Sequence, residues 1–522
     1  MWDRYDCDGD GNFDEPDGYI DTFQSVHAGE GEEAGGGALG AEAIWSHSWS
    51  AWYAGDGPDG AGPHDLGGLR IGNSDFWVVK YTVQPENGGV GVFTHEYGHD
   101  LGLPDLYDTS GGENGTAFWT LMSSGSWIDE GKDSIGNKPS HMGAWEKYQL
   151  GWLNYQVAPV GKTTAFKLGP METNTKQAQG LFVILPKKSV VSNIGAPFAG
   201  SYYYYSSAGD NLNNFMYKAY NLPAGATLSA KVKYNIELDW DYAYLVYSTD
   251  NGATWTPIQT NLSTATNPNS QNFGFGITGI SSGWVDLTAN LPAGNVLLGF
   301  RYWTDTNTGG FGFMVDDISV TGFATDGAEV DAGWTYNPAA GFHVTSGTEA
   351  KLYSHYYVAE YRQYYGYDKG LKTGPYFFGY ANTMPDFVDH FPYQDGLLIN
   401  YWDTSQRNNQ TKNHPGAGLL LPIDAHFNAL RNVNGAVWRN RIQSYDSTFT
   451  LDPTDALTLH VNGVLSPVPS LKGVSMFDDR TQYWDAANPQ GSVKNPNTGT
   501  QIRIVSISAQ GGFMQVEVRP AK

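Results

Sequence analysis

The 522-residue sequence contains a single cysteine, Cys7, so no disulfide bond can form within the chain. Its 30 lysine and arginine residues are outnumbered by 54 aspartate and glutamate residues, which gives a formal net charge of −24. Nucleic acids and anionic membrane surfaces would be repelled by this charge, so neither is expected as a partner. No apolar run approaches the roughly 18 residues that a membrane-spanning helix needs, so no membrane span is expected.

The basic and apolar regions of a signal peptide are also absent from the start of the sequence, which opens on Met-Trp-Asp. A low cysteine content is common in cytosolic proteins, but large bacterial exoproteins also lack disulfide bonds and use calcium instead. The first residues therefore do not reveal the location of the protein. We expect the chain to be a mature or trimmed form.

The composition favours short strands and turns over long helices. The sequence has 65 glycines, 26 prolines, 33 tyrosines and 17 tryptophans, and hydrophobic residues make up 40% of it. That hydrophobic content is sufficient for packed cores, and the length is that of about two to four domains.

Helical periodicity is limited to two segments near the N-terminus, around 88–101 and 139–151, and a strand-like segment at 74–84 precedes them. From about 200 to 323, short alternating strands are separated by turn signals such as Thr-Asp-Asn-Gly at 249–252. This pattern predicts an antiparallel sandwich or jelly roll.

We therefore expect a multidomain protein that starts with an α/β (α+β) domain and continues with β-rich domains. The expected boundaries are 1–160 for the α/β domain, 161–323 for a jelly-roll β-sandwich, 324–345 for a polar, glycine-rich linker and 346–522 for a β-rich C-terminal domain. The core of the sandwich is expected at about 195–323, and its insertion into the neighbouring domain is one arrangement that these boundaries allow.

The most informative segment is His-Glu-Tyr-Gly-His-Asp-Leu-Gly-Leu-Pro-Asp-Leu-Tyr-Asp at 95–108. On a helix, His95 and His99 lie on one face, one turn apart, so both imidazoles can share an ion. Gly102 is expected to end the helix and Pro104 to prevent its continuation, which allows Asp105 to return toward the histidines. Two histidines, one aspartate and a water satisfy the tetrahedral preference of catalytic zinc.

This arrangement predicts hydrolysis of an amide. Zinc lowers the pKa of a bound water to about 7, and Glu96 can take the proton as the general base. Glu96 can later pass that proton to the leaving amine.

Several alternatives stay open at this point. The segment could be an ordinary helix with surface histidines. Asp105 could join Asp108 in a turn or a calcium site, and the third zinc ligand could instead be a distant glutamate, Glu113 or Glu146.

Three segments together resemble the immune inhibitor A family of secreted bacterial zinc metallopeptidases, a metzincin-like family. The segments are residues 95–108, Leu-Met-Ser-Ser-Gly-Ser-Trp at 121–127 and His-Met-Gly-Ala-Trp-Glu-Lys-Tyr-Gln-Leu-Gly-Trp-Leu at 141–153. Further similarity at 8–21, 43–49 and 237–255 extends the resemblance over most of the chain. The resemblance implies that Met122 belongs to a Met-turn, a tight turn that places a methionine beneath the metal.

The resemblance also implies an exported, extracellular bacterial enzyme that acts on protein or peptide substrates and is made with a pro-segment that is cleaved off. In this family the substrate lies along an edge strand above the zinc. The expected strand contains Phe76, Val78 and Lys80, because an extended peptide can add to the edge of a sheet.

An acidic segment near the N-terminus has the spacing of an EF-hand-type calcium loop. The six expected ligands occupy loop positions 1, 3, 5, 7, 9 and 12, with Gly11 at position 6: Asp6, Asp8, Asp10, Asn12, Asp14 and Asp17. The last position is Asp rather than Glu, so its carboxylate could fail to bind in the bidentate mode. The alternative is a solvated acidic turn.

A second, structural calcium site is expected in the sandwich, as in many extracellular jelly rolls. Its candidate ligands are Asp210, Glu237, Asp239, Asp241, Asp316 and Asp317. Acidic residues at strand ends are also commonly just solvated.

We therefore predict a secreted zinc endopeptidase with structural calcium, in which His95, His99 and Asp105 hold the zinc and Glu96 is the general base. The competing hypothesis is a calcium-dependent adhesion or carbohydrate-binding protein with a degenerate peptidase domain. An intact Glu96 argues against that hypothesis.

Overall fold

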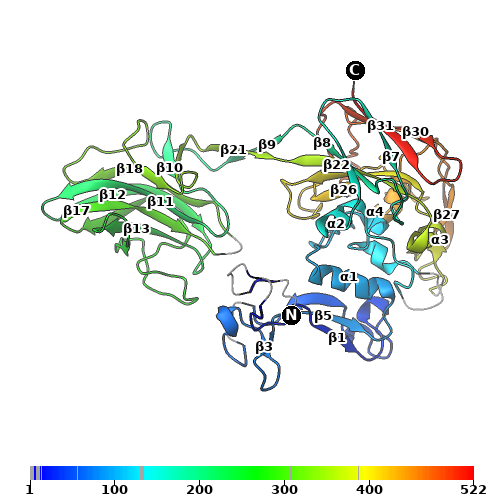
Figure 1. Ribbon diagram of the computed structural model, residues 1–522, viewed down its shortest axis with the longest axis horizontal. Helices are drawn as coiled ribbons and strands as arrows, with labels where there is room; N and C mark the ends of the chain where they lie inside the picture. The colour runs from blue at the N-terminus through cyan, green and yellow to red at the C-terminus, as the bar shows by residue number, and fades with distance from the viewer. Residues whose placement is uncertain are drawn as a thin grey trace. The chain divides into compact units, whose positions relative to one another are not determined.

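The computed structural model describes residues 5–7, 12, 15–53, 55, 57–129, 135–305, 309–385 and 387–521. They form two compact units: unit 1 combines Met1–Lys188 with Tyr353–Lys522, and unit 2 is Ser189–Leu352. Unit 2 is thus inserted into the chain of unit 1 (Figure 1). No helix among the described residues is both long and apolar enough to cross a bilayer.

The N-terminal part of unit 1 contains a three-stranded sheet in the order β1 (Gln24–His27), β5 (Lys80–Pro85), β2 (His47–Ser50). Strand β1 runs parallel to β5, and β2 runs antiparallel to it. Just before β5, a short ladder joins β3 (Leu69–Arg70) to β4 (Trp77–Val78). Helix α1 (Val90–Asp100) follows β5 and packs against this sheet.

Two glycines of α1 allow other segments to approach the helix closely. A Cβ atom at Gly91 would lie 2.1 Å from the carbonyl oxygen of Ser126, and one at Gly98 would lie 2.6 Å from the sulfur of Met122. No side chain larger than hydrogen fits at such distances. The helix η5 (Ser124–Trp127) and the turn before it therefore pack directly against the backbone of α1.

Strands from both sides of the insertion share one five-stranded sheet in unit 1. Its order is β26 (Leu420–Pro422), β25 (Gly396–Asp403), β22 (His355–Arg362), β8 (Gly180–Ile184), β6 (Tyr155–Ala158). A four-stranded sheet is shared in the same way: β29 (Met476–Asp478), β30 (Thr500–Ile507), β31 (Met514–Pro520), β7 (Thr164–Leu168).

The two shared sheets enclose a common core, in which Leu168, Leu181, Ile399, Ile502 and Val516 are fully buried. Residues 164–184 therefore belong to unit 1 and not to the sandwich, which was expected to start at 161. The physical reason is that these apolar strands pair with strands of the C-terminal half.

The remaining elements of unit 1 are short. The helices are η1 (Glu32–Ala34), η2 (Gly40–Glu42), η3 (Pro63–Asp65), η4 (Ala117–Trp119), α2 (Ala144–Gln149), η6 (Gly366–Asp368), α3 (Lys369–Thr373), α4 (Asn440–Gln443) and η7 (Ser444–Asp446). The strand pairs are β23 (Tyr376–Phe377) with β24 (Asp389–His390), and β27 (Leu457–Val461) with β28 (Val464–Val468).

Unit 2 consists of two antiparallel sheets around one core. The first sheet has the order β15 (Gly279–Ile280), β12 (Ala226–Ile236), β18 (Gly312–Val320), β10 (Tyr203–Tyr205), β20 (His343–Thr345), and β16 (Val285–Leu291) also pairs with β12. The second sheet has the order β14 (Thr256–Pro257), β13 (Tyr242–Ser248), β17 (Gly294–Trp303), β11 (Asn213–Leu222), β19 (Thr335–Asn337).

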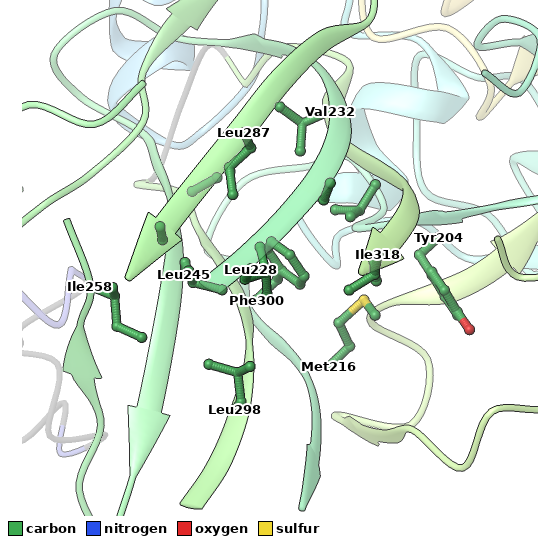
Figure 2. Close-up of a cluster of buried hydrophobic side chains, with 14 of the residues drawn as sticks. Tyr204, Met216, Leu228, Val232, Leu245, Ile258, Leu287, Leu298, Phe300 and Ile318 are labelled. Carbon is green, nitrogen blue, oxygen red and sulfur yellow. The ribbon is translucent and has the colours of Figure 1, made fainter. Parts of the chain in front are cut away.

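Alternate residues of these strands fill the space between the sheets, as Figure 2 shows for Leu228, Val232, Leu245, Leu298 and Phe300. The expected hairpin turn at 249–252 connects β13 to β14, with Asn251 and Gly252 at positive φ. The strands that lead into and out of the unit, β9 (Lys188–Asn193) and β21 (Thr348–Tyr353), pair with each other.

The segment 324–345 is not the linker that its glycine content suggested. It contains β19, which pairs with β11, and β20, which pairs with β10, so it adds a strand to each sheet of unit 2. Trp334 and Phe342, which belong to this segment, are buried in the core. The burial of these aromatic side chains outweighs the local preference for irregular structure.

A buried arginine joins the two halves of unit 1. The side chain of Arg362 is 1% exposed, and its guanidinium lies 2.9 Å from Glu360, 2.6 Å from Asp368 and 3.6 Å from Glu172. Asp368 accepts a hydrogen bond from the backbone N–H of His141 at 2.7 Å. The ion cluster from the C-terminal half therefore fixes the segment that leads into α2.

We expect Arg362→Met to lower the free energy of unfolding of unit 1 by about 3–5 kcal/mol, because it leaves buried carboxylates without a counter-charge. The loss should be smaller at pH 5 than at pH 8, because the uncompensated carboxylates take up protons at the lower pH. Thermal unfolding followed by tryptophan fluorescence at both pH values measures the effect.

The matched control is Arg503→Met, because Arg503 pairs with Glu517 at 2.9 Å but is 41% exposed. Its effect should stay within about 1 kcal/mol. Equal effects of the two substitutions would contradict a structural role for the buried cluster.

Candidate metal centre

His95 and His99 lie one turn apart on α1, with ring centroids 4.9 Å apart and ring planes at 87°. Nδ1 of His95 lies 2.9 Å from the carbonyl oxygen of Leu121, and Nδ1 of His99 lies 2.8 Å from that of Leu103. Because a carbonyl oxygen can only accept a hydrogen bond, each Nδ1 carries the hydrogen. Each ring, when neutral, therefore presents the lone pair of Nε2.

Asp105 lies opposite both lone pairs. The helix ends where Gly102 adopts a φ of +87°, and the N–H of Leu103 donates to the carbonyl oxygen of Gly98 at 3.0 Å. The chain then turns, and Oδ1 of Asp105 comes to lie 3.3 Å from Nε2 of each histidine. The three residues are one of three groups of described residues whose ligand atoms lie close enough to share a metal ion.

The donor set and its spacing fit zinc. Tetrahedral zinc with bonds of about 2.0–2.2 Å places its ligand atoms about 3.3–3.6 Å apart. The observed 3.3 Å between Oδ1 and each Nε2 lies within that range. A cation between two nitrogen lone pairs and a carboxylate oxygen would be attracted by all three atoms.

The electrostatics of the cluster favour a cation. Burial raises the pKa of Asp105, but the hydrogen bonds and positive charge of His95 and His99 outweigh it and hold the pKa well below its usual range. Burial opposes charge on His99, yet the adjacent Asp105 raises the pKa of that imidazole.

Glu96 lies beside the cluster and is buried, with 6% of its surface exposed. Its Oε2 makes no hydrogen bond with the described part of the chain. Burial raises the pKa of Glu96, whereas the neighbouring histidines lower it. A buried carboxylate with a free oxygen at this position can exchange a proton with a bound reactant.

Met122 is fully buried under the helical turn that separates the two histidines, with its sulfur against Gly98. Its N–H donates to Oε1 of Glu146 at 3.1 Å, and its carbonyl oxygen accepts from the N–H of Leu106 at 2.8 Å. The turn around Met122 is thus held from both sides, and the preceding carbonyl orients His95.

The alternative ligands lie elsewhere. Glu113 pairs with Arg439 at 3.1 Å. Glu146 is fully buried and accepts the backbone N–H groups of Met122 and Gly143. Asp108 accepts from the N–H groups of Ser110 and Lys412 at 2.8 and 2.7 Å. Among the described residues, Asp105 is therefore the carboxylate that approaches the histidines.

A pocket of about 170 Å³ borders the cluster. The indole rings of Trp45 and Trp127 form part of its wall, with centroids 5.9 Å apart. Its remaining lining residues are Glu33, Ser46, Val92, His95, Glu96, Tyr107, Asn114, Ser123, Ser124, Ser126 and Arg441.

The expected substrate strand is not at an edge. Lys80 belongs to β5, which pairs with β1 on one side and with β2 on the other. In the segment from Phe76 to Val78, Trp77 pairs with Arg70 of β3 and also forms a bridge with Tyr19. Thr82 and Gln84 of β5 are fully buried, as expected for a central strand. Within this sheet, the edge strand that contacts α1 is β2.

The predicted N-terminal calcium loop can be described only in part. Asp8, Asp10 and Asp14 lie outside the described residues. Of the others, Asp17 is buried, and its carboxylate accepts hydrogen bonds from the N–H groups of Cys7 at 3.0 Å and Tyr19 at 2.8 Å. This carboxylate therefore organises the backbone of the segment.

In unit 2, the structure divides the expected acidic residues into separate groups. Glu237 and Asp241 come together with Asp305, close enough to share an ion. Asp241 is fully buried, and its Oδ2 has no hydrogen-bond partner in the described chain. Burial is the first of several causes, including the charge of Asp210, that raise the pKa of Asp241 to about 7.

The pair Asp316 and Asp317 is not part of that group. Asp316 accepts from the backbone N–H groups of Phe198 and Ala199 at 2.9 and 3.1 Å. Asp239 donates its N–H to Thr278, and its carbonyl oxygen accepts from Tyr242.

Sequence reasoning missed Asp305, Arg441 and Arg362. Asp305 follows β17 closely, so it carries the same signal, an acid at a strand end, that selected Asp241. The two arginines come from segments more than 260 residues beyond α1. No local pattern connects them to the histidines.

Two histidines one turn apart on a helix, an aspartate that returns to them and a buried glutamate beside them form an arrangement that is typical of the metal sites of hydrolases. Family models match the chain in three parts: the immune inhibitor A peptidase M6 catalytic domain at 1–153, the immune inhibitor A-like MAM domain at 164–347 and the immune inhibitor A-like metallopeptidase VEG domain at 350–516.

Curated relatives match nearly the whole chain. Immune inhibitor A of Bacillus thuringiensis subsp. alesti is 32% identical over 545 residues, which cover 97% of this chain and 72% of the relative. The pre-pro-metalloprotease PrtV of Vibrio cholerae serotype O1 is 34% identical over 542 residues, which cover 98% of this chain. The chain spans about half, 55%, of the length of PrtV. The chain belongs to the immune inhibitor A family of metallopeptidases.

We expect Asp105→Ala to weaken zinc binding by at least about 100-fold, because even the loss of a residue that only supports a ligand costs up to that factor. Zinc content after dialysis against a zinc buffer, measured by mass spectrometry, tests this. Glu113→Ala is the control and should retain zinc. Zinc loss in Glu113→Ala but not in Asp105→Ala would reverse the assignment.

Proposed function

We propose that this protein is a zinc-dependent endopeptidase that hydrolyses peptide bonds of protein substrates. The observation that carries the proposal is the convergence of Oδ1 of Asp105 with Nε2 of His95 and of His99, 3.3 Å from each, beside the buried Glu96. Zinc, when bound by these three residues, supplies Lewis acidity that polarises a carbonyl group and acidifies water.

Glu96 is the general base in this proposal. The carboxylate takes a proton from the attacking water at its free Oε2 while the water oxygen bonds to the carbonyl carbon of the substrate. As the C–N bond breaks, Glu96 gives the proton to the amine nitrogen. The low exposure of Glu96 supports this role, because bulk water does not compete for that oxygen.

The extended substrate is proposed to lie along β2. This strand pairs on one side with β5, so its other side offers backbone hydrogen-bonding groups to a peptide. The residues that precede it, Trp45 and Ser46, line the pocket beside the metal cluster. A peptide paired with β2 can therefore insert a side chain into that pocket.

The remaining elements support this site. Met122 is proposed to form the Met-turn of a metzincin-like catalytic domain at residues 1–160. The strands of residues 353–522 complete unit 1, and unit 2 is proposed to be a jelly-roll domain. A calcium-dependent adhesion or carbohydrate-binding role is not favoured, because Glu96 and the three metal ligands are all intact.

We also propose that the enzyme is bacterial, is exported and acts outside the cell, and that it is made with a pro-segment. The description of the Vibrio cholerae relative as a pre-pro-metalloprotease supports this. The low cysteine content of this chain does not conflict with export, because calcium can replace disulfide bonds as the stabilising element.

Two structural calcium sites are part of the proposal. The first is the N-terminal loop with Asp6, Asp8, Asp10, Asn12, Asp14 and Asp17 as ligands. The second is formed by Glu237, Asp241 and Asp305 in unit 2, with Asp210 nearby. The fully buried, unpartnered oxygen of Asp241 supports the second site, because a buried carboxylate oxygen needs a cation or a proton.

We expect Glu96→Ala, loaded with zinc, to cleave an unfolded protein substrate about 10²–10⁴-fold more slowly than the wild type, because the general base is lost. Glu42→Gln, which removes an exposed carboxylate from the same half of unit 1, should cleave at the wild-type rate. Equal cleavage by wild type and Glu96→Ala at equal zinc content would refute the assignment.

Calcium should raise the unfolding temperature of metal-stripped protein to which zinc has been restored. When the free calcium concentration is about 100 times the dissociation constant, one site raises the free energy of unfolding by about 2.7 kcal/mol. Asp241→Asn should remove the contribution of unit 2, whereas Asp317→Asn should keep it. A calcium response that is identical in the two variants would exclude the site at Asp241.

A further inference from the structure

An arginine from the C-terminal half of unit 1 lines the same pocket as His95 and Glu96. Arg441 belongs to α4, a helix far from α1 in the sequence. Its guanidinium packs against the ring of Phe118, with 5.3 Å from the central carbon to the ring centroid. A positive charge therefore forms part of the pocket wall next to the proposed scissile bond.

The hydrogen-bond partners of this guanidinium are neutral. With the amide of Asn114 oriented so that its oxygen faces Arg441, that oxygen accepts from Nη2 at 2.8 Å and from Nε at 3.3 Å. In this orientation the amide nitrogen donates to Oγ of Ser124 at 3.0 Å. A guanidinium has five N–H donors, and this arrangement uses only some of them.

No carboxylate among the described residues lies within ion-pair distance of Arg441. The carboxylate whose charge raises the pKa of Arg441 is Glu113, which already pairs with Arg439 at 3.1 Å. Glu113 thus acts on two arginines, and the pocket lining contains Arg441 as its arginine beside the carboxylates of Glu33 and Glu96. Burial and then the charge of Arg439 lower the pKa of Arg441.

Comparison of Arg441 with Arg362 indicates that Arg441 lacks a carboxylate partner among the described residues. Arg362 is fully buried for a structural role and is surrounded by three carboxylates. A partly buried cation without an anion is costly unless a ligand supplies the counter-charge. Arg441 lines the pocket, so a ligand bound in that pocket can supply the counter-charge.

We propose that this pocket binds a carboxylate of the substrate at a residue flanking the scissile bond, and that Arg441 is the residue that determines this specificity. The proposal rests on the endopeptidase function proposed above. A planar guanidinium recognises a carboxylate through paired hydrogen bonds, which distinguishes it from an amide of the same shape.

The other lining residues suit an acidic side chain with an apolar stem. Trp45, Trp127 and Val92 provide apolar surface for the methylene groups of a glutamate. The one carboxylate in the lining besides Glu96 is Glu33, and Ser46 donates to both of its oxygens, at 2.6 Å from Oγ and 3.1 Å from N. Glu33, which belongs to η1, is thus held by Ser46, the residue that precedes β2.

Peptides identical except for Glu, Gln or Leu at each residue flanking the cleaved bond test the proposal. Wild type should cleave the Glu peptide with a kcat/KM at least about tenfold above that of the Gln peptide at one position. In Arg441→Gln this ratio should fall to about one, and in the control Arg431→Gln, an exposed arginine, it should stay at the wild-type value. Because each ratio is internal to one variant, a general loss of activity does not affect it.

Binding of the same peptides to zinc-loaded Glu96→Ala gives a second readout that needs no cleavage. The Glu peptide should bind at least about tenfold more tightly than the Gln peptide. Peptides that end at the tested residue, with a free or an amidated C-terminus, distinguish a side-chain carboxylate from a terminal one. A preference that follows the free terminus assigns the pocket to the α-carboxylate.

The outcomes separate this inference from the proposed function. Cleavage that depends on Glu96 but shows no preference for Glu over Gln in rate or in binding overturns the role of Arg441 alone. Absence of cleavage by zinc-loaded wild type overturns the proposed function, and the binding ratio then still decides whether the pocket recognises a carboxylate.

Discussion

The arrangement of unit 1 depends on the buried ion cluster around Arg362. The guanidinium holds Glu360 and Asp368 in place, and these carboxylates accept the backbone N–H groups of Ala144 and His141. A buried cation and its carboxylates are stable only when their geometry and hydrogen bonds are complete. The entry into α2 is therefore fixed by residues that follow it by more than 200 positions and that the chain reaches only after completing unit 2.

Helix α2 transmits this constraint to the metal cluster. It carries Glu146, whose carboxylate accepts the N–H of Met122, and the carbonyl oxygen of Leu121 in the same turn orients the ring of His95. Each step is a hydrogen bond to a buried group, so a shift at one end leaves a polar atom unsatisfied at the next. The geometry of the proposed metal ligands is thus supported from outside the segment that carries them, as is common for metal sites.

The difference between local features and features set by distant segments explains what the sequence could predict. His95, His99 and Asp105 lie within eleven residues, and the helix, the left-handed Gly102 and the return of the chain are local features that periodicity and turn chemistry predict. The central position of β5, the strands within 324–345 and the joining of Asp305 to Asp241 are set by pairing between distant segments. Local propensity does not contain that information, and at 324–345 tertiary burial of aromatic side chains outweighs it.

The proposed selectivity for the substrate also depends on a residue that is distant in the sequence. His95 and Glu96, which the proposed mechanism uses, are close together in the sequence, whereas the pocket beside them is lined in part by Arg441 from the other half of unit 1. A change at Arg441 alters the charge of the pocket without touching a metal ligand, because its contacts are Asn114 and Phe118 rather than the histidines. With Arg441 as the proposed specificity residue, substrate preference would vary through the C-terminal half while the local His-Glu motif stays unchanged. For that reason, the motif alone does not determine which peptide bond is cleaved.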